Sequence, residues 1–436
     1  MSVLPDETHA SQLTSWVEGA DGHPDFPIQN LPLCIFSTAE SPPRAGVAIG
    51  PMLLDLAAVA DAGLVGGEDA RILRTAAGRT LNSFFAMSAA QRLRFRHILS
   101  QLLCAGADPP PMLREAVVDA ATARLHLPVD VGDYSDFFAG IHHAATAGRM
   151  FRPDNPLLPN YKHVPIAYHG RSSSVCVSGH PVVRPVGQRA AHGATEPDYG
   201  ASNRLDYELE LAIWVRGGNA LGTTIPIERA GAEIVGFGLL NDWSARDIQA
   251  WETQPLGPFL GKNFLTTVSP FVVTAEALAP FRSPQPPRAQ GDPAPLPYLQ
   301  DAEDQSHGAF DIQLEVLLRT AEMRRSGLAP HRLARSSGLD LYWTPAQMIA
   351  HHSSNGCNLR PGDLFGSGTV SGPGPDGHGS LLELTSGGRN PAVLPNGETR
   401  TFLEDGDEVI LTGWCEREGF ARIGLGEAKG LVVTRG

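Results

Sequence analysis

Alternation of polar and apolar residues is clearest between Leu205 and Val215, where the chain reads LDYELELAIWV. Side chains two positions apart share a face of a strand, so this period predicts a strand. Glu208 and Glu210 would then project side by side from one face, with Tyr207 and the leucines on the other. Because two adjacent carboxylates repel each other, the pattern leaves two alternatives open, a solvated sheet face or a cation site.

A second patterned stretch begins with the apolar run Ile234–Leu240. Helical spacing over Trp243–Glu252 predicts a helix, with Asp242 at the junction between strand and helix. Asp242, Arg246 and Gln249 would share one face of that helix. An aspartate and an arginine in this arrangement form either a surface ion pair or part of a site.

Two further stretches carry candidate chemistry. A Gly/Pro loop follows the second stretch and presents Lys262, one of only three lysines in the chain. Upstream, the sequence from Asp133 to Met150 predicts a helix on which Asp136 and His143, seven positions apart, lie on one face about 10 Å apart. Asp136 is either a metal ligand or an acid that stabilises the helix N-terminus, and His143 is either a base or an ordinary polar residue.

The N-terminal part of the chain, residues 1–122, is predicted to be a small β-rich domain with appended helices. Short strands separated by turn residues are expected around Phe26–Phe36, Ala45–Ile49 and Met52–Leu56. Leu81–Met87 and Ala90–Cys104 have helical patterns.

Strands are predicted to dominate the remainder, residues 123–436. Phe310–Leu318, Leu381–Leu384 and Glu408–Cys415 are expected to be strands, the second with Glu383 inside it. Thr344 followed by Pro345 is typical of a helix N-cap and first turn.

The length of the chain supports two domains, and its composition excludes some classes of partner. A chain of 436 residues exceeds the usual size of one hydrophobic core. The net charge of -13 disfavours nucleic acid and anionic membranes as partners and leaves a small-molecule substrate. Five scattered cysteines lack C-x-x-C spacing, and neither an export signal nor a membrane span is evident, so we expect a cytoplasmic protein with reduced thiols.

The candidate acids define the ligand chemistry. They are Asp136, Glu208, Glu210 and Asp242. Oxygen-only ligation favours a hard divalent cation, namely calcium, magnesium or manganese, over zinc. Arg246 and Lys262 would offset surplus negative charge, and His143 would activate water, but the pattern does not identify the acid that orients it.

Several longer motifs resemble the fumarylacetoacetase family in order along nearly the whole chain. They include DFPIQNLPLCIFS, DYSDF, HHAATAGRMFR, YHGRSSS, DYELELA, NDWSARDIQAWE, PLGPFLGK and HHSSNGCNLRPGD. The resemblance implies a mostly β fold with some α, in which an SH3-like N-terminal barrel precedes a mixed β-sandwich roll. It also implies a homodimer.

The resemblance implies roles for individual residues. Four acids match metal ligands for calcium or magnesium: Asp136, Glu208, Glu210 and Asp242. His143 matches the general base and Glu383 the acid that orients it. Three residues match the set that stabilises an oxyanion: Arg246, Gln249 and Lys262. Three more match positions that contact substrate carboxylates and carbonyls: Arg152, Tyr168 and Thr369.

The reaction that the resemblance implies is hydrolysis of a carbon-carbon bond in 4-fumarylacetoacetate, to fumarate and acetoacetate, in tyrosine and homogentisate breakdown. Two positions depart from the family pattern, because Phe138 and Thr253 stand where the family usually has tyrosines near the substrate. The alternatives are a hydratase, decarboxylase or acylpyruvase of the same superfamily, and a noncatalytic binding protein that a metal stabilises.

Overall fold

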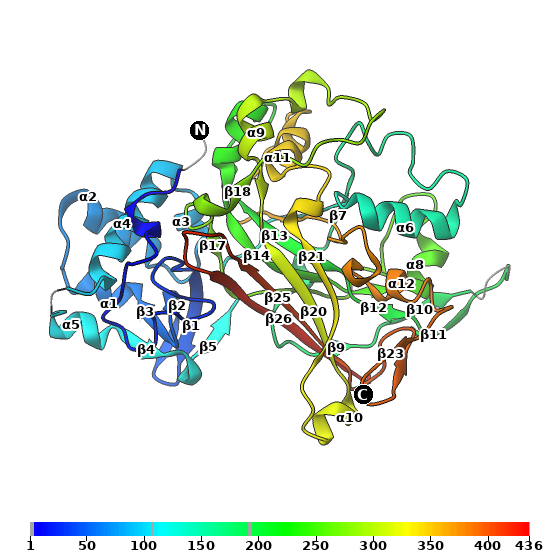
Figure 1. Cartoon of the computed structure of the whole chain (residues 1–436), viewed down its shortest axis with the longest axis horizontal. Coiled ribbons are helices and arrows are strands. Elements are labelled where there is room, and N and C mark those ends of the chain that lie inside the picture. The colour runs from blue at the N-terminus through cyan, green and yellow to red at the C-terminus, as the bar shows by residue number, and fades with distance from the viewer. Residues whose placement is uncertain (1–3, 107, 191–193, 436) are drawn as a thin grey trace.

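Two units lie side by side in the computed structural model, which describes residues 4–106, 108–190 and 194–435 (Figure 1). The N-terminal unit is built on a five-stranded antiparallel sheet with strand order β4-β3-β2-β1-β5. Its strands are β1 (Leu33–Thr38), β2 (Ser41–Ile49), β3 (Met52–Asp55), β4 (Val117–Asp119) and β5 (Arg124–His126). The predicted strands are confirmed, the first only from Leu33 onward, and β5 joins this sheet beyond residue 122. The expectation of a β-rich domain is wrong, because the helices of this unit hold more residues than its strands.

Helices cover one side of the N-terminal sheet (Figure 1). They are α1 (Leu56–Asp61), α2 (Gly67–Ala76), α3 (Asn82–Phe85), α4 (Ala89–Leu103) and α5 (Pro111–Glu115). Ser88 and Gln91 form a capping box at the start of α4, which explains why this helix begins where the pattern predicts.

The second unit contains an eight-stranded mixed sheet that carries the acidic residues. Its main path runs β7-β6-β22-β13-β14-β16-β8, and β17 also pairs with β14. The strands are β6 (Tyr134–Phe137), β7 (Ala167–His169), β8 (Val175–Val177), β13 (Leu209–Val215), β14 (Ile234–Asp242), β16 (Thr266–Val268), β17 (Val273–Thr274) and β22 (Leu364–Gly366).

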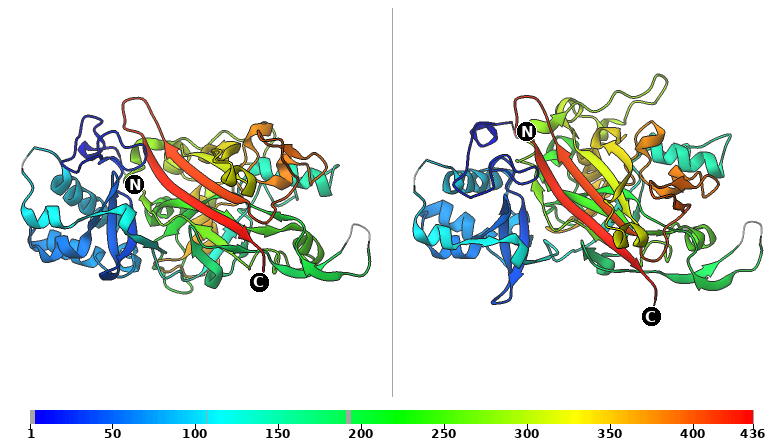
Figure 2. Two further views of the ribbon diagram at one scale, coloured as in Figure 1. Left: turned by 90° about the horizontal axis from the view of Figure 1, so that it is seen from below. Right: turned by 60° about the horizontal axis from the view of Figure 1, so that its bottom comes forward.

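A five-stranded sheet packs against one face of this sheet. Its order is β21-β20-β25-β26-β9, and its strands are β9 (Val182–Val183), β20 (Gln313–Arg319), β21 (His331–Ser337), β25 (Glu408–Cys415) and β26 (Ile423–Val433). Leu211 and Phe237 from the first sheet share one core with Leu314 and Leu411 from the second. Figure 2 shows β26, in red, crossing the length of this domain. The two sheets form a sandwich, and the predicted mostly β fold is confirmed.

The opposite face of the eight-stranded sheet packs on the N-terminal unit. Trp214 of β13 is buried and lies 5.9 Å, centroid to centroid, from Phe85 of α3. Leu33 of β1 forms an isolated antiparallel bridge with Val272. The central strands therefore have both faces covered, which explains their nearly continuous apolar composition.

Shorter elements complete the second unit. The helices are α6 (Ile141–Phe151), α7 (Ile227–Ala230), α8 (Arg246–Glu252), α9 (Ala302–His307), α10 (Ala321–Arg325), α11 (Pro345–Ser353) and α12 (Leu381–Leu384). Two-stranded pairs are formed by β10 (Val186–Arg189) with β11 (Asp198–Ala201), β12 (Leu205–Asp206) with β15 (Ser244–Ala245), β18 (Arg282–Ser283) with β19 (Ala309–Phe310), and β23 (Ala392–Val393) with β24 (Thr399–Arg400).

Three predicted elements are wrong in type or boundary. Asp136 lies on strand β6, and only the second part of the predicted Asp133–Met150 helix is helical, as α6. Leu381–Leu384 is helix α12 and not a strand. Asp242 ends strand β14, so it shares no helix face with Arg246, the first residue of α8.

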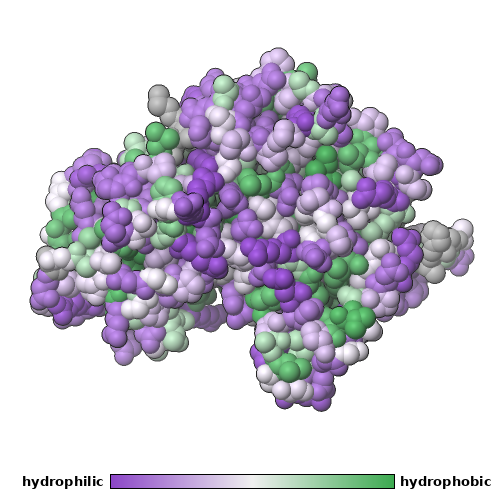
Figure 3. Space-filling model, in the orientation of Figure 1, coloured by the Kyte–Doolittle hydropathy of each residue, from purple (hydrophilic) through white to green (hydrophobic). Residues whose placement is uncertain are grey.

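The hydropathy of the surface and of the helices is that expected from the composition of the chain. In Figure 3 apolar residues form separate patches among polar ones on the face shown. Among the helices that the structure describes, none has both the length and the apolar composition needed to cross a membrane. All five cysteines are free thiols.

Candidate active site

Three strands of the eight-stranded sheet bring three carboxylates together. Asp136 comes from β6, Glu210 from β13 and Asp242 from the end of β14. Their ligand oxygens all lie within 4.8 Å of one another, and all three side chains are buried. Two of these strands are separated in the sheet by β22, so the carboxylates converge across a strand that contributes no acid of its own.

Gly366 makes this convergence possible. It pairs with Asp136 on one side and with Ala212 on the other. A Cβ atom at this position would lie 2.5 Å from Asp136 Oδ1 and 2.7 Å from Glu210 Oε2. Any larger residue would therefore fill the space between the two carboxylates.

The three acids are incompletely paired, as a cation site requires. Asp136 Oδ2 accepts a hydrogen bond from Tyr134 (2.9 Å), and Glu210 Oε2 accepts one from the Gly368 amide (3.0 Å). Asp136 Oδ1 and Asp242 Oδ1 are buried and have no partner among the described residues. Buried oxygens of this kind are costly unless a cation or a proton satisfies them, so the set fits a hard divalent ion.

The pKa shifts of the three acids also indicate a cation site. Burial, followed by the charge of Asp242, raises the pKa of Asp136 well above its usual range. Burial and the charges of Asp136 and Asp242 do the same to the pKa of Glu210. Burial also raises the pKa of Asp242, although Lys262 opposes the effect. Burial and mutual repulsion therefore disfavour the charged form of these acids, and a divalent ion would offset both effects.

Glu208 differs from these three acids because two cations occupy its oxygens. Arg246 Nη1 donates to Glu208 Oε1 (2.7 Å), and Lys262 Nζ donates to Oε2 (2.7 Å). Burial raises the pKa of Glu208, but Lys262 and Arg246 outweigh it, so this pKa lies below its usual value. Lys262 also donates to Asp242 Oδ2 (2.5 Å) and thereby links Glu208 to the three-acid cluster.

A histidine and a glutamate form a second, adjoining unit. His143 Nδ1 lies 2.7 Å from Glu383 Oε2, and both residues are buried. Ser371 and Ser380 each donate to the same oxygen at 2.9 Å. Burial raises the pKa of Glu383, but the contact with His143 outweighs it and leaves the pKa lowered. A carboxylate held ionised in this way orients the imidazole and stabilises its protonated form.

The other nitrogen of His143 faces the charged cluster. His143 Nε2 lies 3.9 Å from Glu208 Oε1. Gly140, which precedes α6, lies so close to Thr369 that a Cβ would approach its carbonyl oxygen to 2.0 Å. Thr369 Oγ1 is buried without a partner among the described residues. The histidine, Thr369 and the acids therefore belong to one site.

The remaining predicted residues lie at different distances from this centre. Tyr168 donates to Asp242 Oδ2 (3.0 Å), and Gln249 accepts from Arg246 (3.2 Å). Arg152 is exposed and donates to the carbonyl oxygen of Pro156 (3.2 Å), so it touches none of the acids. The structure brings Tyr168 and Gln249 to the site and leaves the Arg152 side chain outside it.

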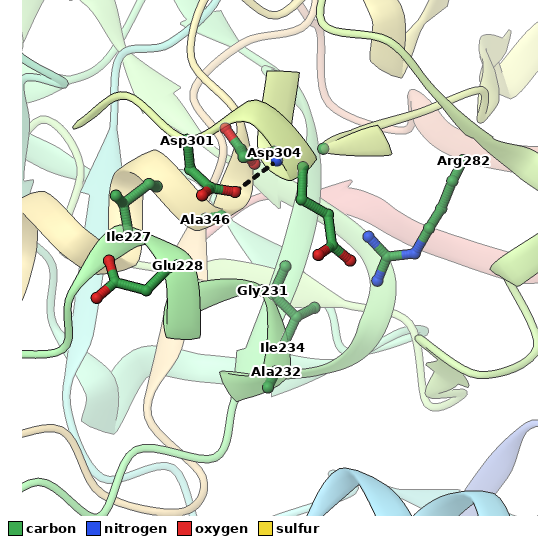
Figure 4. Close-up of a pocket in the computed structure, with 11 residues that line it drawn as sticks. Ile227, Glu228, Gly231, Ala232, Ile234, Arg282, Asp301, Asp304 and Ala346 are labelled. Atoms are coloured by element: carbon green, nitrogen blue, oxygen red, sulfur yellow. Dashed lines mark hydrogen bonds between the residues drawn. The ribbon is translucent and has the colours of Figure 1, made fainter. Parts of the chain in front are cut away.

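A separate pocket, shown in Figure 4, contains none of the predicted site residues. Its lining includes Ile227, Glu228, Arg282, Asp301, Asp304 and Ala346. Figure 4 shows the hydrogen bond that the Asp304 amide donates to Asp301 (2.9 Å) beside this pocket. This pocket lies among α7, α9 and α11 and does not bear on the chemistry of the acids.

Two family models match the chain. One, described as fumarylacetoacetate (FAA) hydrolase C-terminal, matches residues 134–433, and one described as fumarylacetoacetase N-terminal matches residues 29–128. The chain belongs to the fumarylacetoacetase family. The fumarylacetoacetase of Rattus norvegicus is 47% identical over 94% of this chain and 96% of its own length. That of Arabidopsis thaliana is 45% identical over 97% of this chain and 98% of its own length.

The fold is also similar to that of a solved member. A fumarylacetoacetate hydrolase from Exiguobacterium antarcticum aligns with a TM-score of 0.50 and 16% identity, over 93% of this chain and all of that one. At this identity the likeness concerns the fold alone.

Phe138 and Thr253, the two positions predicted to depart from the family pattern, contact His143 and Gln249 in this member of the fumarylacetoacetase family. The Phe138 ring meets the His143 ring edge-on, with centroids 5.5 Å apart and planes at 88°. Thr253 donates from Oγ1 to the Gln249 carbonyl oxygen (2.5 Å) just after α8. Neither side chain carries a phenol hydroxyl.

Sequence reasoning missed several residues that support the site of this fumarylacetoacetase family member. Ser371 and Ser380 hold Glu383, and no local pattern distinguishes them from other loop serines. The Asp206 carboxylate accepts a hydrogen bond from Arg246 Nε (2.9 Å). A signal for Asp206 existed, because it continues the alternation of Glu208 and Glu210 towards the N-terminus.

Proposed function

We propose that this chain is a metal-dependent hydrolase that cleaves a carbon-carbon bond of 4-fumarylacetoacetate to give fumarate and acetoacetate, in tyrosine breakdown. The observation that carries the proposal is the adjacency of the three-acid cluster and the His143–Glu383 pair, which lie on either side of Glu208. The relatives over almost the full length are named fumarylacetoacetase, and their names support the choice of substrate.

Asp136, Glu210 and Asp242 are the proposed metal ligands, with calcium or magnesium as the ion. Glu208 is proposed as a fourth, which requires one of its oxygens to share its Arg246 or Lys262 contact with the ion. When bound, a divalent ion supplies Lewis-acid stabilisation of the negative charge that develops on the substrate oxygens. Lys262 donates hydrogen bonds to both Glu208 and Asp242, so the lysine charge offsets part of the negative charge of these two proposed ligands.

His143 is the proposed general base. It removes a proton from water through Nε2, while Glu383 holds Nδ1 and stabilises the imidazolium that forms. The hydroxide attacks a carbonyl carbon of the β-diketone and gives a tetrahedral oxyanion. Arg246, Gln249 and Lys262 are the proposed donors to this oxyanion.

The bond between the attacked carbon and the neighbouring carbon then breaks. Its electron pair leaves with the acetoacetate part as an enolate, which takes up a proton and becomes acetoacetate, while the attacked carbonyl becomes the second carboxyl of fumarate. Tyr168, Thr369 and Arg152 are the proposed contacts to the carboxylates and carbonyls of the substrate. For Arg152 this requires a movement of its side chain from the Pro156 carbonyl.

The test is the loss of fumarylacetoacetate absorbance with the purified full chain, with and without a chelator. We expect turnover that requires a divalent ion and yields fumarate and acetoacetate. The His143→Ala variant should lose at least about 100-fold in kcat, because general base catalysis typically contributes this much. His142→Ala, the neighbouring histidine on α6, is the matched control and should retain activity.

No turnover by a folded, metal-loaded chain would contradict the proposal. Turnover of acylpyruvates or hydroxy-oxo-dienoates in its place would assign the chain to the other chemistries of the superfamily. The proposal extends to a cytoplasmic homodimer, supported by the family membership and by five free thiols, and light scattering of the purified chain tests the dimer.

A further inference from the structure

One buried carboxylate outside the proposed metal ligands contacts both halves of the site. Asp206 is the last residue of β12, and its side chain is completely buried. Its oxygens accept four hydrogen bonds: from the amides of Tyr207 (2.9 Å), Leu381 (2.8 Å) and Leu382 (2.9 Å), and from Arg246 Nε (2.9 Å). Nothing in the proposed chemistry uses this residue directly.

The contact with Arg246 fixes one half of the site. β12 pairs with β15, with Asp206 opposite Ser244, and β15 leads into α8 at Arg246. The backbone of Asp206 therefore fixes the strand that leads into α8, and its carboxylate fixes the guanidinium of Arg246. Arg246 Nη1 is directed to Glu208, and Nη2 is buried without a partner among the described residues. A free, buried donor on a fixed guanidinium suits an oxyanion that forms only during reaction.

The contacts with Leu381 and Leu382 fix the other half. These two amides form the first turn of α12, which has too few residues to be stable alone. Glu383 is the next residue, and its carboxylate holds His143. Asp206 thus determines where α12 begins, and through α12 where Glu383 lies.

These contacts close a ring through the site. From His143 Nδ1 the ring passes to Glu383, along α12 to Asp206, and on to Arg246 and Glu208. It returns to His143 at Nε2, 3.9 Å from Glu208 Oε1. Both nitrogens of the base are therefore positioned by one connected set of groups.

We propose that Asp206 is a positioning residue that holds Arg246 and the Glu383-bearing helix α12 in one fixed relation. It orients the oxyanion donor and the His143–Glu383 pair together. This inference rests on the proposed function, because it assigns Asp206 a task within that reaction.

The experiment compares Asp206→Asn with a matched control, Asp407→Asn. Asp407 is also completely buried and accepts from an arginine, Arg400 Nε (2.8 Å), and from a backbone amide, that of Glu404 (2.9 Å). The asparagine in Asp206→Asn turns an NH2 group towards one of the present donors. We expect kcat to fall about 10- to 100-fold with KM little changed, the usual effect of losing a residue that orients a catalytic group. Asp407→Asn should lower stability and leave kcat unchanged.

A kinetic double-mutant cycle tests whether Asp206 acts through Glu383. In the Glu383→Gln background, Asp206→Asn should cost much less than it does alone, because the pair that it positions is already broken. Additive losses, or an unchanged kcat in folded Asp206→Asn protein, would overturn the proposal. If Asp206→Asn does not fold, Asp206→Glu keeps the charge, shifts the carboxylate by one methylene and is expected to show the same fall in kcat.

A second readout does not depend on the substrate. The proton in the His143–Glu383 hydrogen bond should give a downfield NMR resonance in the wild-type chain, and this resonance should shift or broaden in Asp206→Asn but not in Asp407→Asn. An inactive wild-type chain in which the resonance responds this way would contradict the proposed substrate and leave the positioning role supported. A resonance unaffected by Asp206→Asn would contradict the positioning role.

Discussion

Four acids that appear equivalent in the sequence occupy two electrostatic states in the structure. Asp136 and Glu210 lack a cationic partner among the described side chains, and burial raises the pKa of both. Glu208 has two cationic partners and a lowered pKa. Carboxylates therefore have two roles in this site. Asp136 and Glu210, which have no cationic partner among the described side chains, attract a cation, whereas Glu208 fixes the positions of Arg246 and Lys262.

Phe138 offers a test of specificity at the level of one atom. The change Phe138→Tyr adds a hydroxyl to a ring that is 36% exposed and lies edge-on to His143. We expect KM for fumarylacetoacetate to fall about two- to tenfold with kcat unchanged, because a neutral hydrogen bond contributes about 0.5 to 1.5 kcal/mol. Steady-state kinetics measures both constants. Phe420→Tyr, on a half-buried ring between β25 and β26, is the control. An equal change of KM in both variants would contradict a place for Phe138 beside the substrate.

At the scale of elements, β22 acts as a spacer in the sheet. Its parallel pairing with β6 and antiparallel pairing with β13 set the distance between Asp136 and Glu210. A strand with any side chain at Gly366 would keep the same hydrogen bonds and lose the space between the acids.

The change Gly366→Ala should therefore weaken metal binding without unfolding the sheet. We expect the affinity for calcium or magnesium to fall about 10- to 100-fold or more, because the methyl group displaces the two carboxylates. Titration calorimetry measures the affinity, and circular dichroism checks the fold. Gly231→Ala, where a Cβ meets nothing within 4 Å, is the control. Unchanged affinity in Gly366→Ala would show that the ion does not lie between these acids.

A different carboxylate connects two helices and gives a pH-dependent contribution to stability. Asp304 of α9 accepts a hydrogen bond from Thr344, the N-cap of α11 (2.9 Å). Burial raises the pKa of Asp304 to about 6. Because the folded pKa lies above the unfolded value, the folded state holds an extra proton between about pH 4 and 6. The stabilisation is complete below this window and is lost as the pH rises through it.

The change Asp304→Asn should remove this pH dependence, because the amide keeps an acceptor for Thr344 and does not titrate. The free energy of unfolding of the wild type relative to Asp304→Asn should fall by about 2 kcal/mol as the pH rises from about 4 to 6. Urea denaturation at several pH values measures the difference. A difference that stays constant across this range would contradict the pKa.

The elements that the sequence predicted wrongly owe their structure to distant partners. The residues around Asp136 have a plausible helix start, but Tyr134–Phe137 pairs with β22, more than two hundred residues away, and becomes a strand. Leu381–Leu384 is helical because Ser380 and the distant Asp206 accept its first amide protons. The strand predicted over Leu205–Val215 is confirmed as β12 and β13, because its alternation of acidic and apolar residues is the local signature of a strand. The acids of the site could be identified from the sequence by residue type. That the pKa of Glu208 is lowered while the pKa values of the other three acids are raised could not be predicted, because it depends on where Lys262 and Arg246 lie.

At the scale of the whole molecule, the two units share buried charge as well as apolar surface. Arg92 of α4 forms an ion pair with Glu276 (3.0 Å), and both side chains are 1% exposed. Arg92 also donates to the carbonyl oxygen of Ile234 at the start of β14 (3.1 Å). The N-terminal unit is therefore attached directly to the strand that ends at Asp242.

The change Glu276→Gln should destabilise both units together. It leaves the Arg92 charge buried without its partner, so we expect a loss of about 3 kcal/mol in the free energy of unfolding. One cooperative transition and normal kcat at 25 °C should remain. Glu427→Gln removes an exposed pair with Lys429 (3.4 Å), and we expect it to change stability by less than about 1 kcal/mol. Calorimetry distinguishes the two, and separate transitions for the two units in Glu276→Gln would contradict the shared interface.

The contact between His143 and Glu383 joins positions 240 residues apart. A ribosome builds the chain from the N-terminus, so the histidine and the first acid emerge long before the glutamate that completes the pair. A nascent chain cannot assemble the base until Ser380 and Glu383 have left the exit tunnel. Products that end before residue 380 would therefore contain the four proposed metal ligands but lack both the acid that orients the base and strands β25 and β26 of the sandwich.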